Sequence, residues 1–362
     1  MKAVILAGGF ATRLRPLSCS RPKTLFPIVN KPLLQWTFER LAKNNITEAI
    51  LAANYETEIH IKQHRIKKAG VHVQYSHDPP KQPLGTAGPI KKARDLLGKN
   101  RTFLVLNGDI FADVNYTELL KNHENEGCTA TIALHTVENP IQYGVAELTS
   151  DGRIGKFVEK PDKESKSNLI NAGVYALDRK IFQLIPDGRA VSIEREVFPK
   201  LAEQNQLYGY VYDGLWADIG KPREFLEINK TLLDLMNQEK HGAIFSSNPT
   251  INNPVAMDNM ISIGDKSMIG PYTVLGKNVS IGKNVQITDS VIFPDTRISD
   301  FSRITGAIIG QAVAIGKNAA ISKGCVIGDN ATIRDGVSLA ENVSICPAVN
   351  VTENMTTSNR IC

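Results

Sequence analysis

Basic side chains gather just after the first apolar run of the chain, at residues 2–7. This run ends at Gly8 and Gly9. Four cations then follow within eleven positions: Arg13, Arg15, Arg21 and Lys23. Free backbone N–H groups at a glycine turn, together with several cations, suit a polyphosphate. The segment matches neither GxxxxGK[ST] nor GxGxxG, so it belongs to neither of the two common phosphate loops.

Carboxylates follow two later runs of the chain. The apolar run TFLVLNGD, at residues 102–109, is typical of a buried strand and ends in a carboxylate, Asp109. Asp218 lies at a turn, before Ile219 and Gly220. Mg²⁺ binds few protein oxygens and keeps phosphate and water ligands, so one or two aspartates suffice. Asp109 is therefore the first candidate metal ligand, with helix or turn capping as its structural alternative.

The basic loop, GGFATRLRPLSCSRPKTL, resembles the GGxGTRLxPLTxxxPKPL signature of the sugar nucleotidyltransferases. That family joins a nucleoside triphosphate to a sugar 1-phosphate and releases pyrophosphate. The resemblance implies that Arg13 and Lys23 bind the triphosphate. Nucleotide contacts are also implied for three residues at the strand end: Leu6, Gly8 and Gly9. This chain departs from the signature at Ala11, Ser18 and Thr24, and the Ala11 methyl group narrows the loop where the family has glycine.

The stretch PLGTAGP, at residues 83–89, is a second candidate nucleotide site. Gly85 and Gly88 have no side chain, so their backbone can approach and hydrogen-bond a nucleobase edge. The structural alternative is a helix entry capped by Thr86. The sequence LGTAGP, which follows SHDPPKQP, resembles the corresponding segment of the mannose-1-phosphate guanylyltransferases. This resemblance implies GTP and mannose 1-phosphate as substrates. Asn107 lies on the same face of its strand as Asp109, so we expect it to contact the ribose.

Three further family landmarks, YGV, FVEKP and NAGVY, imply a sugar site between residues 143 and 175. Gly144 lets the main chain approach a sugar, Glu159 accepts from its hydroxyls, and Asn171 both donates and accepts. Lys160 places a compact cation beside the sugar phosphate. Taken alone, the EKP sequence is more typical of an ordinary surface turn. The resemblance of WADIGKP assigns the second Mg²⁺ ligand to Asp218.

The elements that must position these residues alternate between strand and helix. The expected helices include 33–43, 59–69, 90–97, 192–203 and 222–238, and Pro199 is an awkward residue inside the fourth. This pattern predicts an α/β fold with a mostly parallel, Rossmann-like sheet of the nucleotide-diphospho-sugar transferase type. Ligands of such sheets gather at the carboxyl ends of the strands, where Gly8 and Asp109 would lie.

From about residue 248 a different pattern begins, with an aliphatic residue at every sixth position. It runs through Ile263, Ile269, Leu275, Ile281 and Ile287 and resumes at Ile315 after a slip between residues 293 and 309. Such hexads predict a left-handed parallel β-helix of about five coils. Acyltransferases share this fold and generally use a catalytic histidine there, but the last histidine is His241. We therefore expect a nucleotidyltransferase domain at 1–240 and an assembly or regulatory β-helix at 248–362.

Composition limits the other classes. The chain has 362 residues, 42% hydrophobic and 22% charged, with a net charge of +5, which is typical of a globular protein rather than a nucleic-acid binder. Five scattered cysteines predict neither a disulfide framework nor a zinc site. The apolar N-terminal run is too short for a signal sequence or a membrane span. We expect a cytoplasmic protein with no nucleic-acid or membrane partner.

Together these patterns predict an enzyme that uses Mg²⁺ and forms a homo-oligomer through its β-helix. Its substrates are a nucleoside triphosphate, with GTP favoured, and a sugar 1-phosphate, with mannose 1-phosphate favoured. Two alternatives stay open. One is a glucose-1-phosphate thymidylyl- or uridylyltransferase. The other, motivated by Ala11, is a non-catalytic regulatory subunit that binds sugar nucleotides.

Overall fold

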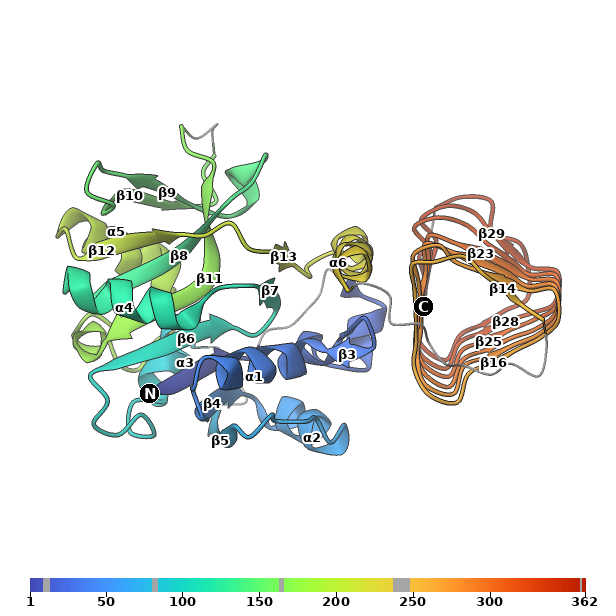
Figure 1. Ribbon diagram of the computed structural model, residues 1–362, viewed down its shortest axis with the longest axis horizontal. Helices are drawn as coiled ribbons and strands as arrows, with labels where there is room; N and C mark the ends of the chain where they lie inside the picture. The colour runs from blue at the N-terminus through green and yellow to red at the C-terminus, as the bar shows by residue number, and fades with distance from the viewer. Residues whose placement is uncertain (9–13, 80–83, 163–165, 237–247, 359) are drawn as a thin grey trace. The chain divides into compact units, whose positions relative to one another are not determined.

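The computed structural model describes residues 1–8, 14–79, 84–162, 166–236, 248–358 and 360–362 (Figure 1). Two compact units make up the chain. The first consists of Met1–Gly9 and Leu33–Asp218, and the second of Phe10–Pro32 and Ile219–Cys362. The chain therefore leaves the first unit after its first strand and returns to it at residue 33. The predicted limits at residues 240 and 248 stay a prediction.

Parallel strands form the centre of the first unit. They are β1 (Lys2–Leu6), β4 (Glu48–Ala53), β5 (His72–His77) and β6 (Thr102–Asn107), in the order β6-β1-β4-β5. Continuous apolar runs such as KAVIL suit strands that are covered on both faces. In the register, Leu6 lies opposite both Ala52 and Asn107. The predicted Rossmann-like sheet is confirmed, and its carboxyl edge is the edge that carries Leu6 and Asn107.

Antiparallel strands extend this sheet beyond β6. The long strand β11 (Leu169–Asp178) pairs with β6 on one side and with β8 (Ala130–Thr136) and β9 (Gly144–Leu148) on the other. Strand β12 (Leu207–Val211) pairs with β8, and β10 (Ile154–Glu159) pairs with β9. A separate two-stranded ribbon joins β7 (Ile110–Ala112) to β13 (Trp216–Asp218). The sheet is therefore parallel on the side of β1 and largely antiparallel beyond β6.

Three predicted helices differ from the observed ones. The helix predicted at 90–97 is α3, Ala87–Lys92, and so begins and ends earlier. Helix α1 (Leu33–Lys43) lies where expected, but α2 is Tyr55–Gln63 rather than 59–69. Asn54 accepts a hydrogen bond from the Thr57 N–H at 2.7 Å and so begins the helix earlier. Around Pro199 a π-helical turn, η6 (Ile193–Val197), leads into α5 (Phe198–Glu203). Pro199 is thus accommodated in the first turn of a new helix. The other helices are α4 (Tyr116–Glu126) and α6 (Pro222–Leu235), with a short helix η5 (Arg179–Gln183).

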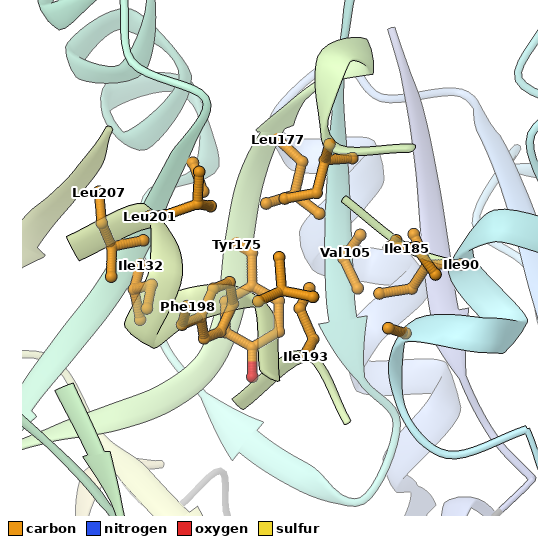
Figure 2. Close-up of a cluster of buried hydrophobic side chains, with 14 of the residues drawn as sticks. Ile90, Val105, Ile132, Tyr175, Leu177, Ile185, Ile193, Phe198, Leu201 and Leu207 are labelled. Atoms are coloured by element: carbon orange, nitrogen blue, oxygen red, sulfur yellow. The ribbon is translucent and has the colours of Figure 1, made fainter. Parts of the chain in front are cut away.

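A hydrophobic core covers one face of the mixed sheet, as Figure 2 shows. Phe198 of α5 packs edge-on against Tyr175 of β11, with ring centroids 5.1 Å apart. Leu201 and Leu207 continue the same cluster, which Ile90 of α3 also joins. Tyr175 is fully buried. This core holds β11 rigidly between β6 and β8.

The second unit contains residues 10–32, which include most of the predicted basic loop, together with α6 and the β-helix. Its N-terminal part has two short 3-10 turns and a hairpin: η2 (Leu17–Cys19), η3 (Lys23–Leu25), β2 (Pro27–Ile28) and β3 (Lys31–Pro32). Phe26, Phe225 of α6 and Phe293 of the β-helix pack edge-on, with centroids 5.9 to 6.3 Å apart. All three rings are buried.

Three parallel sheets form the β-helix, consistent with the predicted left-handed form. One sheet comprises β14 (Thr250–Ile251), β17 (Met268–Ile269), β20 (Gln286–Thr288), β23 (Arg303–Thr305), β26 (Ala320–Ile321) and β29 (Ser338–Leu339). A second comprises β15 (Val255–Met257), β18 (Thr273–Leu275), β21 (Val291–Ile292), β24 (Ile308–Ile309), β27 (Val326–Ile327), β30 (Ser344–Ile345) and β32 (Arg360–Ile361). The third comprises β16 (Ser262–Ile263), β19 (Ser280–Ile281), β22 (Arg297–Ile298), β25 (Ala314–Ile315), β28 (Thr332–Ile333) and β31 (Asn350–Val351).

The slip in the hexad pattern is a shortening of the coils by one residue. Met268 pairs with Gln286, eighteen residues later, whereas Gln286 pairs with Arg303, seventeen residues later. Because the register continues through the shorter coils, each face stacks six or seven strands within the described residues, and the expected five coils were too few. Glycine after the aliphatic residue is required by close packing. A Cβ at Gly328 would lie 2.6 Å from the Pro347 nitrogen of the next coil.

A disulfide joins Cys346 to Cys362, a single pair that the prediction of no disulfide framework did not anticipate. Strand β30 pairs in parallel with β32, and each cysteine directly follows its strand, which brings their Cα atoms to 4.8 Å. The spacing of sixteen residues matches no short cysteine motif. Within the described part of the chain, no helix combines the length and the apolar character that crossing a membrane requires.

Candidate functional site

The two predicted metal ligands come from adjoining backbone positions. In the β7–β13 ribbon, Asp218 lies opposite Ile110, the residue that follows Asp109 (Figure 1). Opposing Cα atoms in an antiparallel pair are about 4.5 to 5.5 Å apart. The Gly108 N–H donates to the Leu6 carbonyl at 2.9 Å. Both aspartates therefore lie at the carboxyl ends of β1 and β6.

A third carboxylate, which the sequence analysis missed, lies at the same edge. Asp78 follows the end of β5, and its N–H donates to the Ala53 carbonyl at 3.2 Å. A Cβ built on Gly8 would lie 3.3 Å from Asp78 Oδ2. Oδ1 is buried and has no hydrogen-bond partner within the part of the chain that the structure describes. Burial raises the pKa of this carboxyl, against the lowering effects of Lys92 and His77. Its signal in the sequence is the one used for Asp109, a carboxylate directly after a strand.

The three residues predicted to bind the sugar lie together. Gly144 of β9 lies opposite Glu159 of β10 in the register. A Cβ at Gly144 would lie 2.7 Å from Glu159 Oε2 and 3.4 Å from the Asn171 Cβ. Burial, and then the neighbouring Glu194, raise the pKa of the Glu159 carboxyl, whereas Lys160 lowers it. This corner therefore combines a carboxylate and an amide packed closely around a glycine.

Asn171 is held by a bulge in β11. Its Nδ2 donates to the Tyr175 hydroxyl at 3.0 Å, and its Oδ1 accepts from the Gly173 N–H at 2.9 Å. Gly173 has a φ of +73°, and a Cβ there would lie 2.9 Å from Asn107 Nδ2. The residues predicted to bind the sugar therefore lie next to Asn107, at the end of β6. Trp216 Nε1 donates to the Ala172 carbonyl at 3.3 Å, which ties the strand of Asp218 to the same bulge.

The cations predicted to bind phosphate differ in their exposure and in the unit to which they belong. Lys160 follows Glu159 with a φ of +51°, is exposed, and its Nζ lies 3.9 Å from Glu159 Oε1. Lys23 is buried in η3 and belongs to the second unit, whereas the other described candidates belong to the first. Arg13 and Gly9, together with Ala11, lie outside the described residues.

In the second candidate nucleotide site, residues 83–89, close packing against residues 191–194 explains why Gly85 has no side chain. Gly85 has a φ of +72° and forms a bridge with Val191, whose carbonyl oxygen would lie 2.3 Å from a Cβ. Thr86 lies at the N-cap position of α3, as the structural alternative expects, but its side chain makes no capping hydrogen bond. Its hydroxyl donates to Glu194 at 2.5 Å and accepts from the Ile193 N–H. At Gly88 a Cβ would lie 2.5 Å from the Leu84 Cβ.

The donor set at the strand ends suits a hard cation. Asp109 and Asp218 offer carboxylate oxygens, which Mg²⁺ prefers, and the ion needs few protein ligands when phosphates and waters complete its shell. Within the described ranges, no cluster of three or more His, Cys, Asp or Glu could hold a metal ion. The two aspartates therefore fit a magnesium ion shared with a phosphate.

Comparison with known proteins covers both parts of the chain. The profile of the family described as nucleotidyl transferase matches residues 2–234. The profile described as GMPPB C-terminal domain matches residues 251–361. All described candidate residues of the first unit lie within the first match.

Similar proteins include guanylyltransferases. The chain is 40% identical over 262 residues to the mannose-1-phosphate guanylyltransferase catalytic subunit beta of Dictyostelium discoideum, covering 71% of each protein. It is 44% identical over 230 residues to the Danio rerio protein of the same name, covering 62% of this chain and 63% of that one. A solved structure, HddC from Yersinia pseudotuberculosis complexed with GMP-PN, matches with a TM-score of 0.55 and 26% identity over 64% of this chain and 99% of that one.

Proposed function

The chain belongs to the nucleotidyl transferase family, and we propose that it joins GTP to mannose 1-phosphate, forming GDP-mannose and pyrophosphate. The observation that carries this proposal is the register of β7 against β13. It brings Asp218 beside Asp109 at the edge where β1 and β6 end. Cations and phosphates are expected at that edge of a parallel sheet.

In the proposed reaction, a phosphate oxygen of the sugar 1-phosphate attacks the α-phosphorus of the nucleotide in line. A new P–O bond forms, the bond to the bridging oxygen breaks, and pyrophosphate leaves. The protein contributes mainly positioning and charge neutralisation. Arg13 and Lys23 hold the triphosphate, and Lys160 holds the sugar phosphate. Glu159 and Asn171 accept from and donate to the sugar hydroxyls above Gly144.

Asp109 and Asp218 are the residues that would hold Mg²⁺. When bound, the ion neutralises phosphate charge and orients the reacting groups. The remaining work falls to the chain itself, because fixed donors and cations around the phosphates need no reorganisation as charge develops.

Asp78 supports guanine as the base. A carboxylate is an acceptor with two oxygens, and the Watson–Crick edge of guanine presents two adjacent donors, N1–H and N2–H₂. Asp78 lies against Gly8 with its Oδ1 unpaired among the described residues. Gly85 and Gly88 flank the base through their backbone, and Asn107 contacts the ribose.

The test is a substrate panel with pyrophosphate release as the readout. GTP, dTTP and UTP are each combined with mannose 1-phosphate and glucose 1-phosphate, with Mg²⁺ present. We expect GTP with mannose 1-phosphate to give the highest kcat/KM. Asp109→Asn and Asp218→Asn should each reduce kcat by roughly a hundredfold or more. Asp113→Asn is the matched control, because Asp113 follows the other end of β7, is exposed, and pairs with Arg40.

Each alternative has its own result in this panel. A preference for glucose 1-phosphate with dTTP or UTP would replace the proposed specificity. Binding of GDP-mannose without pyrophosphate release from any pair would indicate the non-catalytic regulatory subunit. The homo-oligomer and the cytoplasmic location stay predictions.

A further inference from the structure

Arg21 is one of the four cations that follow the first strand, but its charge is already neutralised by the β-helix. Arg21 Nη2 lies 2.5 Å from Asp329 Oδ2, and each side chain is 7% exposed. Both residues belong to the second unit. The guanidinium also lies 4.9 Å from the centroid of the Phe293 ring and donates to Gln311 Oε1 at 3.1 Å. A cation engaged in this way is not free to bind a phosphate.

The two oxygens of Asp329 do different work. Oδ1 accepts from the Gln311 N–H at 2.7 Å, a bond at the corner of the β-helix. The same corner bond recurs six residues later, where Asp335 Oδ1 accepts from the Lys317 N–H at 2.7 Å. Asp335 is exposed. The repeating corner of the β-helix therefore explains the hydrogen bond to Asp329 Oδ1, but it does not explain the contacts of Asp329 Oδ2.

Oδ2 of Asp329 binds the C-terminal part of the basic loop. It accepts from the Ser20 hydroxyl at 2.6 Å as well as from Arg21. Farther along the segment, Asn30 Nδ2 donates to the Leu275 carbonyl at 2.9 Å. Ser20, Arg21 and Asn30 are therefore fixed to the β-helix within the second unit.

We propose that Asp329 is a positioning residue for the nucleotide. Through Arg21 and Ser20 it fixes the C-terminal end of the phosphate loop, and Lys23 lies two residues beyond that anchor. The charge pair is buried, so removal of one partner leaves the other charge uncompensated and releases the segment. The inference rests on the proposed nucleotidyl transfer. It adds that the β-helix keeps Lys23, a predicted triphosphate ligand of the same unit, in position.

The test compares Asp329→Asn with Asp335→Asn in the full chain. Asparagine keeps the Oδ1 acceptor at each corner, so both variants preserve the β-helix bond and remove one charge. We expect Asp329→Asn to raise the KM for GTP roughly tenfold or more with little change in the KM for the sugar 1-phosphate. Asp335→Asn should change neither constant. Arg21→Gln should match Asp329→Asn, and the double variant should be no worse than either single one.

Hydrogen exchange separates this inference from the proposed function. Asp329→Asn should speed amide exchange in residues 14–26, and Asp335→Asn should not. If the wild-type chain releases no pyrophosphate from any pair, the proposed function fails, and faster exchange in Asp329→Asn still supports the anchor. Unchanged exchange in both Asp329→Asn and Arg21→Gln would overturn the inference. Faster exchange with an unchanged KM for GTP in an active enzyme would also overturn it.

Discussion

Substitution of Gly144 by alanine tests the sugar site directly, because the new methyl group has no space. Its Cβ would lie 2.6 Å from the Phe157 Cζ and 2.7 Å from Glu159 Oε2, whereas ordinary contact begins at 3.4 Å. Phe157 cannot yield easily, since it is buried and packs edge-on against Phe198 at 5.6 Å. The Glu159 carboxylate must therefore move by about 0.7 Å, the shortfall from ordinary contact.

A displacement of this size in a substrate-binding group should lower kcat/KM for the sugar 1-phosphate by roughly 10- to 100-fold. That loss corresponds to about 1.4 to 2.7 kcal/mol of transition-state stabilisation. The KM for the nucleotide should stay close to the wild-type value, because Gly144 lies among the residues predicted to bind the sugar and not the nucleotide. Overpacking should also cost about 1 to 3 kcal/mol of unfolding free energy.

Steady-state kinetics with each substrate varied in turn, together with thermal unfolding, measure these effects. Gly155→Ala is the matched control on the same hairpin. Gly155 is exposed, and the nearest atom to its added Cβ is a methyl carbon of Thr149 at 3.1 Å. A folded Gly144→Ala protein with wild-type kinetics for the sugar 1-phosphate would refute the assignment of this corner to the sugar.

Two further predictions concern Asp78 and the disulfide. Burial raises the pKa of Asp78, so its ionisation is less favourable in the folded state, and the stability it contributes is lost as pH rises through the raised pKa. In thermal unfolding scans from pH 4 to 8, Asp78→Asn should remove this loss of stability with rising pH. The same variant should raise the KM for GTP roughly tenfold or more. An unchanged KM would contradict the role of Asp78 at the base. The Cys346–Cys362 disulfide closes a loop with a separation of sixteen residues. Cys362→Ser should therefore lower the unfolding free energy of the second unit by about 3 kcal/mol, measured by denaturant unfolding. The control is Cys19→Ser, which changes an exposed free cysteine. Equal stability of Cys362→Ser and the wild type would contradict the prediction.

Features with local signals in the sequence could be predicted. The six-residue period predicted the β-helix because every coil repeats the same inward aliphatic position. The ends of apolar runs predicted the strand ends that carry Asn107 and Asp109. The early start of α2 was missed, although Asn54 followed by Glu56 and Glu58 is a recognisable helix start.

Features that depend on contacts between distant residues could not be predicted. Arg21 and Asp329 are 308 residues apart, and nothing near either one specifies the other. Arg21 was therefore grouped with the phosphate-binding cations by proximity in the sequence alone. The same holds for Asp109 and Asp218, whose shared ribbon comes from strand pairing, although the family resemblance had already assigned both to the metal.

The aromatic cluster of Phe26, Phe225 and Phe293 has a practical consequence for protein engineering. A shortened protein that stops after α6 would lose Phe293 and leave the other two rings, now fully buried, without their cover. Newly exposed aromatic surface of this kind favours aggregation. Attempts to produce a minimal catalytic fragment should therefore replace Phe26 and Phe225 with polar residues, or retain the first coils of the β-helix.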